Sequence, residues 1–183
     1  NTFMGGTTIS NGVVALGNAF GLGPYANATV TFGAGTTNGT LRMNGYNATV
    51  VGLNSDAIIP GAPAVENGHA ATISTLTINN AVSNTFAGVF RNGGVAALAL
   101  TKNGPGILTL SGTNAHTGIN TLVGGILRAQ GNSNALGLNA TATALTLNTP
   151  GTELQVAGDT GLNFCRSATV SASMQITSDR STP

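Results

Sequence analysis

The chain has 183 residues, enough for one domain, and 6% of them are charged, with a formal net charge of +1. Its six Lys and Arg residues are dispersed, so the sequence offers no basic field and predicts no nucleic-acid partner. No apolar run approaches the roughly 20 residues that span a bilayer, and we expect no direct membrane insertion of this segment. A hydrophobic fraction of 41% is too high for a disordered polymer.

Short segments with apolar residues at every second position recur along the chain, a pattern typical of strands with one buried face. In chain order they span residues 30–32, 40–43, 48–53, 71–78, 97–101, 107–110, 121–123 and 126–129. Asn-Gly pairs, which readily take the positive φ of a tight corner, punctuate them and begin at Asn11, Asn38, Asn44, Asn67, Asn92 and Asn103. No helical stripe of ten or more residues is present, so we predict an all-β fold.

The sequence also resembles itself over a long interval. Residues 1–45 resemble residues 114–158, which indicates an internal repeat of about 113 residues. The matching positions include Asn1, Gly5, Thr8 and Gly12, which recur as Asn114, Gly118, Thr121 and Gly125. We therefore expect residues 1–183 to form a single segment of a longer repeat protein.

Two architectures fit such strands, a β-sandwich or a parallel β-helix in which short strands stack turn upon turn. Strands of three to five residues, Gly-rich corners and long-range self-similarity favour the β-solenoid. The scarcity of charge fits as well, because like charges on successive turns would lie about 4.8 Å apart and repel. Stacked Thr or Asn side chains avoid that repulsion.

One run carries a family resemblance. Residues 98–118 read LALTKNGPGILTLSGTNAHTG, and the corner Gly124-Gly125-Ile126-Leu127 follows. This run resembles the autotransporter-associated β-strand repeat, and residues 1–8 look like a second copy without its upstream half. The departures are His116 or Phe3 in place of the usual Tyr, and Ile119-Asn120 in place of the usual Gly-Thr.

The resemblance implies a right-handed parallel β-helix in an autotransporter passenger. Such a passenger is secreted or displayed on the outer membrane, so the expected location is extracellular or at the cell surface. The leading hypothesis is a non-catalytic structural segment that acts as an extracellular stalk or adhesin scaffold. Its expected partners are adjoining turns of the same chain or other copies of itself, with a host surface or a glycan reached through other domains.

Two alternatives remain open. A solenoid cut between turns exposes unpaired backbone groups at its ends, so end-to-end stacking into an extracellular filament or matrix is one of them. A Thr ladder that binds ice or a glycan is the other, although Thr is also common on any solvent face of a β-solenoid. The threonines considered for the ladder are Thr29, Thr31, Thr75, Thr77, Thr141, Thr143 and Thr146.

Few groups of residues in the sequence could form a catalytic or metal site. We predict no catalytic, cofactor-binding or metal-binding residue and no enzyme activity. Glu153 and Asp159 could converge on adjacent turns, but solvated corner carboxylates are the expected interpretation. His69 and His116 lie far apart in sequence and make a poor zinc site. Cys165 is the only cysteine, lies beside apolar residues and is expected to pack as a small hydrophobic side chain.

Overall fold

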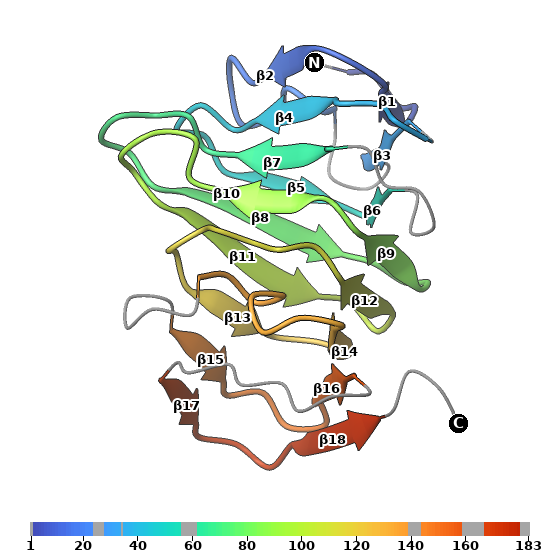
Figure 1. Ribbon diagram of the computed structural model, residues 1–183, viewed down its shortest axis with the longest axis vertical. Coiled ribbons are helices and arrows are strands. Elements are labelled where there is room, and N and C mark those ends of the chain that lie inside the picture. The colour runs from blue at the N-terminus through green and yellow to red at the C-terminus, as the bar shows by residue number, and fades with distance from the viewer. Residues whose placement is uncertain are drawn as a thin grey trace.

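The computed structural model describes residues 2–23, 28–33, 35–55, 62–138, 144–158 and 167–179. These residues form strands joined by turns and loops, with no helix among them, and every strand pairs in parallel with a strand one turn away. The turns stack along the long axis, so that the first strands lie at one end and the last strands at the other (Figure 1). The prediction of an all-β parallel β-solenoid is confirmed.

Four parallel sheets cover the sides of the solenoid. The first contains β1 (Thr7–Ile9), β3 (Thr29–Phe32) and β6 (Gly52–Asn54). The second contains β2 (Val13–Ala15), β4 (Thr40–Arg42), β7 (Ala64–Glu66) and β10 (Val89–Arg91). The third contains β5 (Ala48–Val50), β8 (Ser74–Asn79), β11 (Leu98–Asn103), β13 (Asn120–Leu122), β15 (Leu145–Leu147) and β17 (Ala168–Val170). The fourth contains β9 (Asn84–Phe86), β12 (Ile107–Leu110), β14 (Ile126–Gln130), β16 (Glu153–Ala157) and β18 (Gln175–Asp179).

The first and fourth sheets continue one another along the same side. Ser55, just after β6, donates its backbone N–H to the carbonyl oxygen of Thr85 in β9 at 2.9 Å. Asn84 donates its side-chain Nδ2–H to Oδ1 of Asn54, also at 2.9 Å. The chain therefore passes from this side to the second sheet and then to the third in each of its central turns (Figure 1).

Register between turns is regular although the turns differ in length. Thr101 pairs with Thr121, 20 residues on, and Thr121 pairs with Thr146, 25 residues on. The additional residues are accommodated between the strands, so the strands themselves keep their pairing. Side chains at equivalent positions consequently form columns that run along the solenoid axis.

The interior is filled by the inward side chains of all four sheets. In β11, Leu98, Leu100 and Lys102 are buried while the residues between them are half-buried, which is the two-residue period of a strand. Aromatic rings form part of this core, because the Phe86 ring lies 5.5 Å from that of Phe32 and 4.9 Å from that of Phe90. Tilted rings at these distances pack favourably in addition to the area they bury.

The predicted strand positions are largely right, with informative exceptions. The segment 48–53 is divided into β5 and β6, with Val51 at the corner between them. The segment 71–78 becomes strand only from Ser74, because residues 71–73 belong to the preceding corner. Within residues 30–129 the prediction missed β7, β9 and β10; all three residues of β7 are buried, so it has no alternation to show.

The Asn-Gly corners behave as expected with one exception. Glycine takes positive φ in five of the six pairs, at Gly12, Gly45, Gly68, Gly93 and Gly104. Gly39 does not, and a Cβ built there would collide with the carbonyl oxygen of Ile9 on the neighbouring turn. Glycine at position 39 therefore allows close approach between turns rather than a left-handed backbone.

The sequence repeat does not place its two copies on the same sheets. The alignment of residues 1–45 with 114–158 pairs residues of β3 with residues of β15, yet β3 belongs to the first sheet and β15 to the third. The repeat thus remains a prediction from the sequence. The described residues also contain no helix long and apolar enough to cross a membrane.

Candidate functional site

The outer face of the third sheet carries a column of threonines on six successive strands. Register pairs them without a break: Thr49, Thr77, Thr101, Thr121, Thr146 and Thr169. Each is the central residue of a triplet whose neighbours, on all but the last strand, are buried, so each threonine points outward. Successive hydroxyl groups are consequently spaced by one strand separation, about 4.8 Å.

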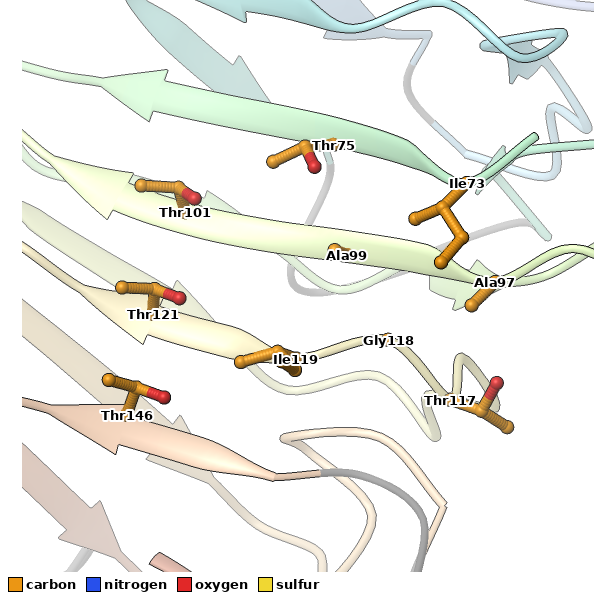
Figure 2. A pocket seen from close by; sticks show the side chains of 10 residues that line it. All are labelled: Ile73, Thr75, Ala97, Ala99, Thr101, Thr117, Gly118, Ile119, Thr121 and Thr146. Carbon is orange, nitrogen blue, oxygen red and sulfur yellow. The ribbon is translucent and has the colours of Figure 1, made fainter. Parts of the chain in front are cut away.

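Beside this column the face is hollowed to a volume of about 470 Å³. Figure 2 shows the lining side chains in columns: Thr101, Thr121 and Thr146 in one, with Thr75, Ala99 and Ile119 beside it. The remaining lining residues are Ile73, Ala97, Thr117 and Gly118. Ala97 and Ala99 have short side chains, whereas Ile73 and Ile119 on the flanking turns are 60% and 49% exposed and stand higher. The hollow therefore has an alanine floor between isoleucine walls.

The chemistry available in this hollow is that of hydroxyl and methyl groups. None of its ten lining residues is ionisable. A threonine hydroxyl donates one hydrogen bond and accepts others, while the alanine and isoleucine side chains offer only apolar contact. The arrangement can hold a ligand, but it supplies no general acid, general base or nucleophile activated by a neighbouring base.

The threonines named from the sequence are distributed over different places. Thr77 and Thr146 belong to the outward column, and Thr75 and Thr146 line the hollow. Thr29 and Thr31 lie in the first sheet, on another side of the solenoid, and Thr141 and Thr143 lie outside the described residues. The sequence analysis missed Thr49, Thr101, Thr121 and Thr169. The sequence signal that could have revealed this column is a threonine between two apolar or buried residues in each successive strand of the third sheet.

A second cluster joins three turns through charged side chains in the second sheet. Register places Arg42, Glu66 and Arg91 in one column. Arg42 Nε donates to Glu66 Oε1 at 2.7 Å, and Arg91 Nε donates to Glu66 Oε2 at 2.8 Å. Burial by itself raises the pKa of Glu66, but the hydrogen bonds and charges of both arginines outweigh it and hold the pKa below 4.5. Because a negative charge lies between two positive ones on successive strands, neighbouring charges in this column attract each other instead of repelling.

Among the described residues Lys102 is also a buried charged side chain, and it faces the interior. Its Nζ donates to the carbonyl oxygens of Asn103, Gly104 and Gly124 at 2.8–2.9 Å, so it ties a corner to the next turn. Burial lowers the pKa of Lys102 to about 8. The three carbonyl oxygens satisfy all three donors of the ammonium group, which makes this lysine a structural element.

The two histidines are separate, and each has a local structural role. His69 Nδ1 accepts hydrogen bonds from the backbone N–H groups of Ala71 and Thr72. His116 is buried, with Nε2 3.0 Å from Asn120 Oδ1 and its ring edge-on to that of Phe90. No group of three His, Cys, Asp or Glu side chains suited to a metal ion occurs within the described residues.

The remaining candidates from the sequence are placed only in part. Glu153 lies in β16, where its Oε1 accepts a hydrogen bond from Gln155 Nε2 at 3.1 Å. Asp159, the possible partner of Glu153, lies outside the described residues, as does Cys165. The proposed convergence of the two carboxylates and the packing of the thiol therefore stay predictions.

Comparisons with known proteins bear on this architecture. Residues 1–16 and 100–129 match the passenger-associated-transport-repeat family. Over 113 residues the chain is 34% identical to a protein described as an adhesin autotransporter, BmaC, from Brucella suis biovar 1 (strain 1330). That alignment covers 60% of this chain and 3% of the relative, so the chain matches a small part of a much longer protein. The comparison with solved structures gave no match.

Proposed function

We propose that this chain, which carries repeats of the autotransporter passenger family, is a non-catalytic structural segment of a secreted or surface-displayed passenger. In this role it acts as an extracellular stalk or as the scaffold of an adhesin. The observation that carries the proposal is the uninterrupted parallel stacking of strands along one axis. Each added turn lengthens such a scaffold by about 4.8 Å without a new fold.

The buried polar groups support a mechanical role, because they connect turns to one another. Glu66 joins three turns through Arg42 and Arg91. Asn67 is buried, donates from Nδ2 to the carbonyl oxygens of Thr72, Ala96 and Ala97, and accepts the Gly45 N–H at Oδ1. Satisfied polar networks of this kind give a core a single, rigid arrangement.

An exchange experiment in the parent passenger tests the proposal. Deleting the segment should reduce the adhesion of cells that display the passenger, since the distal part would lie closer to the membrane. Replacing it with an unrelated β-solenoid of equal length should restore adhesion, because the scaffold role requires only length and stiffness. Failure of the replacement, or receptor binding by the isolated segment as tight as that of the whole passenger, would contradict the stalk role.

Self-assembly is a second candidate, favoured by the ends of the described solenoid. β1 and β2 at one end, and β17 and β18 at the other, have a strand partner on one side only. Apolar side chains are exposed at both ends, including Val13 and Ile176. Further turns of a longer chain or another copy could cover these edges. Electron microscopy distinguishes the two, because head-to-tail addition predicts rods whose length grows with protein concentration.

A further inference from the structure

We propose that the hollow beside the threonine column binds an extended, uncharged polysaccharide. This inference goes beyond the scaffold role and does not depend on it. The site consists of the floor at Ala97 and Ala99, the walls at Ile73 and Ile119, and the hydroxyl groups of the neighbouring threonine column (Figure 2). A sugar ring matches this combination of apolar surface and hydroxyl groups, because its faces carry C–H groups and its rim carries hydroxyl groups.

The threonine hydroxyls of this site are available to a ligand. Some threonine side chains of this protein bond internally, since Thr37 Oγ1 donates to the Gly33 carbonyl oxygen and Thr152 Oγ1 to that of Thr149. By contrast, within the described residues Thr101, Thr121 and Thr146 form no side-chain hydrogen bond to the protein, although each is half-buried. Hydroxyl groups in this position need an external partner, either water or a ligand.

Regular spacing favours a repeating ligand over a single sugar. Thr101, Thr121 and Thr146 lie on three successive strands, so their hydroxyls recur about every 4.8 Å along the solenoid axis. The column continues beyond the hollow to Thr77 and Thr49 on one side and Thr169 on the other. A chain of sugars laid along this column would meet equivalent donors and acceptors in each turn.

Charge decides which class of polysaccharide fits. The lining holds no ionisable side chain, and the nearest lysine in the same strand, Lys102, is buried with its ammonium group held by three carbonyl oxygens. A uronate or sulfate polymer would find no cation here to offset the loss of its hydration. The hollow also has no aromatic side chain on which a sugar ring could stack. We therefore expect weak binding of the polysaccharide, with a dissociation constant on the order of 1 mM.

Methyl NMR of the 183-residue protein provides the test, with cellohexaose as the neutral probe and tri-galacturonate as the charged one. Cellohexaose should shift the methyl signals of Ala97, Ala99, Ile73 and Ile119 in a saturable way. Ala99→Leu fills the floor and should abolish the shifts, and Thr101→Val with Thr121→Val should weaken binding about fivefold or more. Thr109→Val is the matched control, because it removes the same hydroxyl from the outer face of the fourth sheet.

Several results would overturn the inference. These are the absence of saturable shifts with cellohexaose, equal loss of affinity in the Thr109→Val control, or binding of tri-galacturonate alone. Shifts of the same methyl groups that depend on protein concentration without sugar would instead assign the hollow to a second copy of the chain. Thermal hysteresis without sugar binding would assign the threonine column to ice. None of these results would change the scaffold proposal, which the exchange experiment tests separately.

Discussion

Lys102 Nζ lies 2.9 Å from the carbonyl oxygen of Gly124, which belongs to the next turn of the solenoid. The ammonium group therefore links a buried position of one strand to the corner of the following turn. Glu66 performs a similar function in the second sheet, where it accepts hydrogen bonds from the turns on both sides. In a chain with so few charged residues, these buried charges hold successive turns together.

Replacing Glu66 with Gln should destabilise the fold. The neutral amide keeps the shape but has one acceptor oxygen instead of two, so it loses at least one of the two hydrogen bonds and leaves Arg42 and Arg91 without a compensating charge. We expect a loss of about 1–3 kcal/mol in the free energy of unfolding, measured by denaturant titration. Glu153→Gln is the control and should change stability by less than about 0.5 kcal/mol. Equal effects of the two substitutions would remove the argument for a special role of Glu66.

Acid should weaken the same cluster. The pKa of Glu66 in the folded protein lies below 4.5, so the unfolded chain binds a proton more readily than the folded one. The contribution of Glu66 is therefore complete above about pH 4.5 and is lost as the pH falls through the folded pKa. Thermal unfolding of wild type and Glu66→Gln should consequently converge as the pH is lowered below 4.5. A constant difference between the two proteins down to pH 2 would contradict this assignment.

Lys102 should produce a dependence of the same sign, a stability that rises with pH, but in the alkaline range. Its pKa is about 8 in the folded protein and 10.5 for an ordinary lysine, so the folded state releases the proton first. Between these values the unfolded chain binds more protons, and stability rises with pH. Wild type should therefore gain stability relative to Lys102→Met from about pH 8 to 10.5. Parallel pH profiles of the two proteins would show that burial does not perturb this lysine.

Tight contact between turns should make one glycine indispensable. A Cβ added at Gly112 would overlap the carbonyl oxygen of Gly88 on the adjacent turn, and backbone cannot move aside as a side chain can. Gly112→Ala should cost several kcal/mol, on the order of 3 kcal/mol or more. Gly17→Ala is the control, because nothing lies within 4 Å of its added Cβ and its φ is not positive. Comparable melting temperatures for the two variants would contradict the stacking distance in this region.

The central phenylalanine of the aromatic column should be the most costly to remove. Phe86 is fully buried and contacts both Phe32 and Phe90, so truncation would leave a cavity bounded by rigid backbone. Phe86→Ala should cost about 3–5 kcal/mol. Phe20→Ala, at a position that is 50% exposed, should cost much less. Urea titration of both variants measures the difference in their free energies of unfolding, provided that their m-values equal that of wild type. Equal losses in the two variants would contradict a special role of Phe86.

The sequence predicted the class of fold because its signals are local. Alternation in residues 107–110 requires only that one side of a strand be buried, and the Gly12 corner requires only a residue that tolerates positive φ. Register between turns is not local, because turns of 20 and 25 residues are both present. For this reason the Arg42, Glu66 and Arg91 column and the complete threonine column became visible only in the structure.

The hollow could not have been predicted for a related reason. It arises where the short side chains of Ala97 and Ala99 lie between Ile73 and Ile119, which are 46 residues apart in the chain. Only the lateral alignment of three turns brings these side chains together (Figure 2). The sequence analysis considered threonine pairs within single strands, whereas the structure builds the face from one threonine in each strand.

Linear stacking is the claim on which the scaffold role depends, and distances between spin labels measure it directly. After Cys165, the only cysteine, is replaced by Ser, cysteine pairs at 77 and 146 and at 49 and 169 can be labelled. Three and five strand steps separate these positions, so their Cα distances should be about 14 Å and 24 Å. Two distances that do not increase in this ratio would contradict the continuous parallel stack.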